Sequence, residues 1–133
     1  MPEGAVSRRS MVWIAQRGSG VLALSLVANA VFLFIVRAGG VVPIFRPLSY
    51  GSVLFLTAAG AIGATIAYAI LARLANDPDR SFRTLALVFL VLSFVPDFTL
   101  APTFPGSTTA GIIVLMTMHV VVAVFAVWLF TRV

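Results

Sequence analysis

The sequence predicts an all-α integral membrane protein, a four-helix bundle in which residues 1–133 form one domain and both termini are cytoplasmic. Three observations support this fold class. First, 61% of the residues are hydrophobic and only 10% are charged, whereas soluble domains contain about 25% charged residues. Second, there are four apolar runs close to the length of about 20 residues that a membrane-spanning helix needs. Third, the arginines are distributed unequally between the two ends of these runs.

The first predicted span is residues 18–36, which lie between Arg17 and Arg37. The preceding segment SRRSMV resembles a twin-arginine export signal, and residues 28–30 resemble a cleavage site for it. The apolar run continues beyond this site to Val36, where a cleavable signal would become polar. We therefore interpret the segment as a retained span.

The second predicted span covers residues 50–72 and ends at Arg73. The connection before it, residues 37–49, has an apolar centre between two arginines and is expected in the outer interface. In the connection after it, residues 73–83, the run Asn76-Asp77-Pro78 breaks the helix, and Ser81 is the expected cap of the next one.

The third predicted span, residues 84–101, is interrupted by Pro96, and the distance from Arg83 to Pro96 is too short to cross the bilayer. Residues 97–105 are therefore expected to complete the span as a kinked or irregular segment. Asp97 follows the proline directly, where it is expected either to cap exposed N–H groups or to accept a hydrogen bond from His119. The fourth span is residues 108–130.

The orientation follows from the arginines that flank the spans. Seven of the nine basic residues fall on one side, and the positive-inside rule makes that side cytoplasmic. All nine are arginine, which indicates a GC-rich bacterial genome and hence the bacterial cytoplasmic (inner) membrane. The dispersed arginines exclude a nucleic-acid partner. The absence of cysteine excludes disulfides, iron–sulfur clusters and cysteine-bound zinc.

Few polar side chains remain inside the spans, and each is costly in lipid. Three of them lie 12, 14 and 13 residues from the arginine at the cytoplasmic end of their span: Asn29 from Arg17, Asp97 from Arg83 and His119 from Arg132. At the helical rise of 1.5 Å per residue, these separations place all three at one depth, about 18–21 Å from the arginines. Ser25 and Ser93 lie four residues before Asn29 and Asp97 and extend this candidate ligand-binding set.

Small residues recur at spacings of three or four on the second and fourth spans, where they favour close packing of helices. The predicted packing positions are Gly60, Gly63, Ala64, Ala67 and Gly111.

Two short motifs carry a resemblance to a known family. Pro96-Asp97 near the outer end of the third span and Met118-His119-Val120-Val121 in the fourth are similar to a family of small, uncharacterised bacterial four-span membrane proteins. The resemblance covers most of the chain. It implies the fold, but it assigns no activity.

The leading functional hypothesis is a non-enzymatic accessory or scaffold subunit that packs against other membrane chains or forms a homo-oligomer. The alternative is a small binding or transport protein with an outward-facing intramembrane pocket, lined by Asn29, Asp97 and His119 and opening through residues 97–107. A third hypothesis is a membrane enzyme or a subunit that binds haem or a chlorophyll-type pigment through His119. No catalytic residues are expected, because no catalytic motif is present. No metal site is expected either, since one histidine and one aspartate are too few ligands for zinc.

Overall fold

The computed structural model describes residues 9–40 and 46–131. Four helices, α1 (Met11–Ala38), α2 (Tyr50–Leu74), α3 (Pro78–Thr99) and α4 (Thr109–Thr131), account for most of these residues. Two 3₁₀ turns, η1 (Arg46–Leu48) and η2 (Ala101–Thr103), precede α2 and follow α3. All four helices are long and apolar enough to cross a membrane, and the described residues contain no strand. The predicted all-α membrane fold is thus confirmed.

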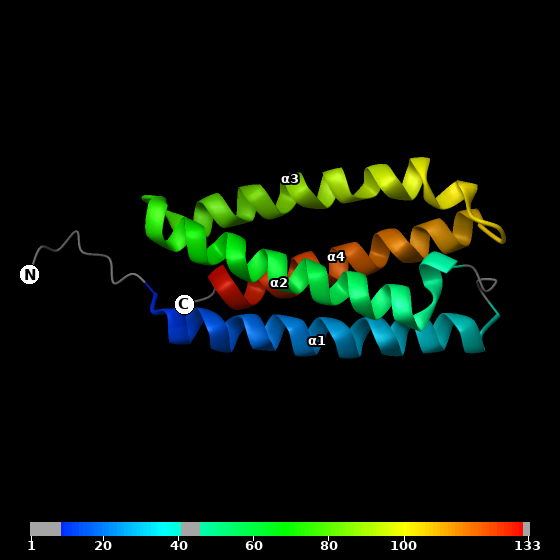
Figure 1. Ribbon diagram of the computed structural model, residues 1–133, viewed down its shortest axis with the longest axis horizontal. Helices are drawn as coiled ribbons and strands as arrows, with labels where there is room; N and C mark the ends of the chain where they lie inside the picture. The colour runs from blue at the N-terminus through cyan, green and yellow to red at the C-terminus, as the bar shows by residue number, and fades with distance from the viewer. Residues whose placement is uncertain (1–8, 41–45, 132–133) are drawn as a thin grey trace, which may run out of the picture.

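The four helices run side by side, and α1 begins at the same end of the bundle at which α4 finishes (Figure 1). We call this the terminal end and the other the opposite end. The α2–α3 connection lies at the terminal end, whereas the connection from α3 to α4 lies at the opposite end (Figure 1). This up-and-down arrangement needs only short connections.

Helix α1 begins at Met11, earlier than the apolar run starts, because the side chain of Ser10 caps it by accepting a hydrogen bond of 3.0 Å from the backbone N–H of Trp13. Its buried residues recur every three or four positions and make one narrow stripe along the helix: Ile14, Gly18, Val21, Ser25, Asn29, Leu33 and Val36. This is the spacing of a helix that packs along its whole length. Ser25 and Asn29 therefore lie in the middle of a packed seam.

Gly18 marks a close approach of α1 to α2. A Cβ atom added there would lie 2.5 Å from Cγ2 of Thr65, which is closer than packed carbon atoms come. Gly18 therefore sets the α1–α2 distance, although the sequence analysis did not identify it as a packing residue. At Gly63, by contrast, an added Cβ would meet no atom within 4 Å, so no described helix of this chain packs closely against that glycine.

The α2–α3 connection is shorter than predicted. Helix α2 ends at Leu74, and α3 begins at Pro78, with proline at the first helical position. Asp77 is the cap, since its side chain accepts a hydrogen bond of 3.2 Å from the backbone N–H of Arg80. The expectation that Ser81 caps this helix is wrong, because a capping aspartate directly before a proline starts the helix one turn sooner.

Pro96 does not end α3. The helix continues through it to Thr99, and the N–H of Leu100 donates to the carbonyl of Pro96 over 2.8 Å. The irregular segment that was expected from residue 97 onward therefore begins only after Thr99. Asp97 lies within the last helical turn, so its expected role as a cap of exposed N–H groups is wrong. Transmembrane helices tolerate an internal proline where neighbouring helices support them.

Two apolar clusters fill the bundle. The cluster at the opposite end joins both 3₁₀ turns to the helices and consists of Leu33, Val36, Leu48, Val53, Ala101, Val114, Leu115 and Met118. The cluster at the terminal end consists of Ile14, Val21, Ala61, Tyr68, Ala72, Phe82, Ala126 and Phe130. In the terminal cluster Tyr68 stacks on Phe130 with ring centroids 4.8 Å apart. Helix α3 contributes only two buried residues, Phe82 and Asp97, so most of its length stands on the flank of the bundle.

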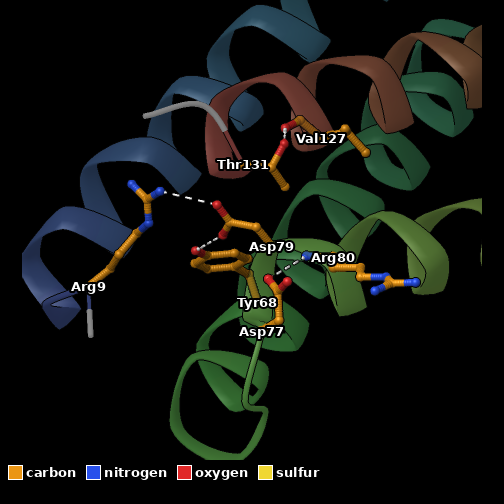
Figure 2. A network of polar contacts seen from close by, with 7 residues as sticks. All are labelled: Arg9, Tyr68, Asp77, Asp79, Arg80, Val127 and Thr131. Atoms are coloured by element: carbon orange, nitrogen blue, oxygen red, sulfur yellow. Dashed lines mark hydrogen bonds and ion pairs between the residues drawn. The ribbon is translucent and has the colours of Figure 1, made fainter. Parts of the chain in front are cut away.

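A polar network closes the terminal end (Figure 2). Asp79, in the first turn of α3, accepts a 2.7 Å hydrogen bond from the hydroxyl of Tyr68 and pairs with Arg9 at 3.2 Å. The guanidinium of Arg9 also lies over the ring of Trp13, 4.1 Å from its centroid. The network thus joins the residues that precede α1 to α2 and to the start of α3.

We expect Tyr68→Phe to lower the free energy of unfolding by about 1.5 kcal/mol, because it removes a hydrogen bond to a charged acceptor and leaves the stacked ring in place. Thermal unfolding in detergent micelles measures this loss. Tyr50→Phe is the matched control, since Tyr50 is partly exposed and its ring contact with Arg37 does not need the hydroxyl. Equal stability of wild type and Tyr68→Phe would show that the network contributes nothing to stability.

Candidate functional site

A contact between a carboxyl group and an imidazole joins α3 to α4 within the bundle. Oδ2 of Asp97 lies 2.9 Å from Nδ1 of His119. The two side chains are unequally buried, with 7% of the aspartate and 32% of the histidine exposed. Phe94, one turn before Asp97, lies beside the imidazole with ring centroids 6.4 Å apart. The contact that the sequence analysis expected between Asp97 and His119 is present in the structure.

A second polar cluster lies between α1, α2 and α4. Asn29 is completely buried, and its Nδ2 donates to Oγ1 of Thr57 at 3.0 Å and to the carbonyl of Met118 at 3.5 Å. The carbonyl oxygen Oδ1 of Asn29 is buried without a hydrogen-bond partner, as is the hydroxyl of Ser25 one turn earlier. Asn29 bonds to the carbonyl of the residue that precedes His119, so the two clusters are adjacent on α4.

A cavity of about 440 Å³ lies between α2, α3 and α4. Its lining is almost entirely apolar, and the polar residues that reach it are Asn29, Thr57, Ser93 and His119. Helix α2 contributes four of the small residues predicted to pack helices: Gly60, Gly63, Ala64 and Ala67. In this structure they form a wall of the cavity, which explains the open space beside Gly63. The fifth, Gly111, is buried near the start of α4, where its N–H donates to the side chain of Thr108.

The cavity differs from the pocket that the sequence analysis expected. No residue of the 97–107 segment lines it, so the expectation that it opens through this segment is wrong. Asp97 is not a lining residue, because its carboxylate contacts the imidazole of His119. His119 therefore lines the cavity, whereas Asp97 contacts the imidazole of His119 and does not line the cavity. Ser25 also lies outside the lining, in the α1 seam.

The Asp97 contact decides what His119 can offer to a molecule in the cavity. When the carboxylate is ionised and the ring is neutral, Nδ1 carries the hydrogen and Nε2 is a hydrogen-bond acceptor. The unpartnered Oδ1 of Asn29 is also an acceptor. Ser93 donates its hydroxyl hydrogen to the carbonyl of Leu90 over 2.6 Å, which leaves its lone pairs for a further contact. The polar groups on the lining are thus arranged to accept hydrogen bonds.

Metal binding finds no support in the part of the chain that the structure describes. Residues 9–40 and 46–131 contain no group of three or more His, Cys, Asp or Glu side chains that could hold an ion. Asp97 and His119 together supply only two protein ligands, fewer than zinc sites use. Ligation of haem or a chlorophyll-type pigment by Nε2 of His119 stays a prediction.

Sequence reasoning missed two parts of this site. It did not connect Thr57 to Asn29, and it gave the backbone of Met118 no role. A pairing signal for Thr57 was available, since Thr57 and Asn29 are polar residues within consecutive spans. The Met118 carbonyl has no sequence signal, because every residue has a carbonyl group.

Comparison with known proteins identifies the family of the chain but assigns it no activity. No curated protein and no solved structure matches the chain. Residues 8–133, nearly the whole chain, match the family of unknown function DUF6069. This match and the four apolar helices confirm the predicted kinship with small four-span membrane proteins that have no assigned activity. The protein belongs to the DUF6069 family.

Proposed function

We propose that the protein is a non-enzymatic membrane protein that binds a lipophilic molecule carrying a hydroxyl group in the cavity between α2, α3 and α4. The observation that carries the proposal is an apolar cavity whose lining includes Asn29 and His119, two side chains that contain hydrogen-bond acceptors. A cavity with a few polar groups in an apolar lining is typical of small-molecule sites.

The polar groups would provide the selectivity. A molecule that enters from the bilayer exchanges lipid contacts for protein contacts, so the apolar lining gives little net hydrophobic stabilisation. A hydroxyl group in hydrocarbon, by contrast, lacks a hydrogen-bond partner and is strongly disfavoured. His119 and Asn29 would supply that partner, and Asp97 would hold the imidazole in the tautomer that accepts. Asp97 is thus a positioning residue in this proposal.

The test uses a photoreactive long-chain alcohol and its methyl ether, which has the same chain but no hydrogen to donate. In liposomes we expect the alcohol to label the cavity residues at least about tenfold more efficiently than the ether, because the ether leaves the acceptors unpaired. Mass spectrometry of peptides locates the label. Equal labelling by both probes would contradict the proposal.

Two variants with the same side-chain change serve as test and control. Ala64→Phe places a ring in the cavity and is expected to abolish labelling, whereas Ala23→Phe lies on the exposed face of α1 and is expected to leave it unchanged. His119→Leu should reduce the difference between alcohol and ether, because only the acceptor of Asn29 remains. Retained selectivity in His119→Leu would show that another group recognises the hydroxyl.

The scaffold role is the second candidate, and the exposure of α2 and α3 supports it. The small residues of α2 face a cavity that no other described helix fills, and small residues allow a partner helix to approach closely. A second copy or another membrane chain would then occupy this flank. Since the chain contains no cysteine, Gly63→Cys gives a single-cysteine protein. Disulfide dimers formed by Gly63→Cys but not by Ala23→Cys in membranes would favour this role.

The proposed location is the bacterial cytoplasmic membrane, with the terminal end of the bundle in the cytoplasm. The excess of arginines at this end supports that orientation. The polar Arg9–Asp79–Tyr68 network at the same end fits a position in the headgroup region, where charged side chains remain hydrated.

A further inference from the structure

We infer that a second groove, on the outer side of α3 and α4, binds an anionic glycerophospholipid of the surrounding bilayer. The groove is lined by Arg83, Ala86, Leu87, Leu90, Ala123, Val124, Val127, Trp128 and Thr131. Its lining residues run from Arg83 to Leu90 on α3 and from Ala123 to Thr131 on α4. The start of α3 and the end of α4 both lie at the terminal end (Figure 1). The groove adjoins the cavity proposed to bind an alcohol, since Ala86, Leu90 and Ala123 line both, but Arg83 and Trp128 line the groove and not the cavity.

The charge at the start of the groove selects the headgroup. Arg83 is the one charged residue on the lining, and no ion pair joins it to an acidic side chain among residues 9–40 and 46–131. The acids nearest to it in sequence are otherwise engaged, since Asp79 binds Arg9 and Tyr68, and Asp77 caps α3. A guanidinium group binds a phosphate through two parallel N–H donors.

The remainder of the groove fits an acyl chain. Beyond Arg83 its walls are the side chains of Leu87, Leu90, Val124 and Val127, and Leu87 and Val124 are more than half exposed. In a membrane-spanning protein such a surface faces lipid tails, so an acyl chain is the available occupant. Trp128 lies near the Arg83 end, at the level where tryptophan is enriched at membrane interfaces. The order of cation, aromatic ring and apolar walls matches the order of phosphate, glycerol region and tail.

Fluorescence quenching of Trp128 tests this inference. The chain has two tryptophans, and Trp13→Phe leaves Trp128 as the single reporter. This protein is reconstituted in phosphatidylcholine vesicles that contain phosphatidylglycerol as a minor component, with bromine on the acyl chains of one lipid or the other. Brominated phosphatidylglycerol is expected to quench Trp128 about fivefold more strongly than its mole fraction predicts, the selectivity that one arginine at the membrane surface provides.

The control distinguishes binding of the lipid at Arg83 from a general attraction of anionic lipid to the charged surface. Arg83→Gln is expected to reduce quenching to the level set by mole fraction. Arg80→Gln makes the same charge change on the same helix, but Arg80 does not line the groove, and the preference should persist. An equal loss in both variants, or equal quenching by the two brominated lipids in the parent protein, would overturn the inference. If Trp13→Phe does not fold, subtraction of the Trp128→Phe signal from that of the wild type isolates the same reporter.

Discussion

His119→Ala is expected to lower the free energy of unfolding by about 3 kcal/mol. The substitution leaves the carboxylate of Asp97 buried without its partner at 2.9 Å. Because Asp97 is 7% exposed and His119 is 32% exposed, the charge left behind is the more deeply buried of the two. Unfolding in micelles or bilayers, followed by circular dichroism, measures this loss.

Substitution of the other partner, Asp97, should lower the free energy of unfolding by less. Asp97→Ala leaves an imidazole that is one-third exposed, so we expect a loss of about 1–2 kcal/mol. Asp97→Asn retains an oxygen that can accept a hydrogen bond from Nδ1 and should cost still less. The order of stability is therefore wild type, Asp97→Asn, Asp97→Ala and His119→Ala.

A double substitution identifies the cause of the stability loss in His119→Ala. If the stranded carboxylate is responsible, Asp97→Asn in the His119→Ala background should recover more than half of the lost stability, because it removes the buried charge. Simple addition of the two losses would mean that the cost of His119→Ala arises from lost packing instead. A loss below about 1 kcal/mol for His119→Ala would show that Asp97 is hydrated when unpaired.

Gly18→Ala is the second substitution with a large expected effect. The added Cβ would lie 2.5 Å from Cγ2 and 2.6 Å from Oγ1 of Thr65, and Thr65 is fixed in turn by a 2.8 Å hydrogen bond from its hydroxyl to the carbonyl of Ala61. Either α1 moves away from α2 or Thr65 changes rotamer and loses that bond. We expect the free energy of unfolding to fall by about 1–3 kcal/mol, measured by thermal unfolding in micelles.

The same substitution at a second glycine is the control. At Gly63 an added Cβ meets no atom within 4 Å, so Gly63→Ala should leave stability unchanged or raise it by up to about 1 kcal/mol through higher helix propensity. Thr65→Ala should restore stability to Gly18→Ala by removing the atoms that clash. Equal effects of alanine at residues 18 and 63 would show that Gly18 does not set the helix spacing.

The four helices and their membrane environment could be predicted from the amino-acid sequence alone. Long apolar runs of this kind can satisfy their backbone hydrogen bonds within lipid only as helices, so fold class follows from composition and length. The depth at which Asn29, Asp97 and His119 lie could also be estimated, since the rise per residue of a helix is fixed. The expected Asp97–His119 contact followed from that estimate.

Local chemistry was harder to predict at helix ends. The residues before α3 offered two capping side chains, and Asp77 rather than Ser81 is the one used because Pro78 suits the first helical position. Pro96 suggested a break, but the helix continues through it, since packing against a neighbouring helix can support the turn from which one hydrogen bond is missing.

Which side chains face each other across helices depends on the packing of the folded bundle and could not be predicted from the sequence. The small residues of α2 predicted a close helix contact, yet they line the cavity, and the close contact lies at Gly18 instead. Likewise, Asp97 contacts His119 but does not line the cavity. The periodicity of one helix shows which residues share a face, but the rotation and separation of its neighbours result from the packing of all side chains together. The sequence therefore determined what crosses the membrane, and packing determined where the cavity lies.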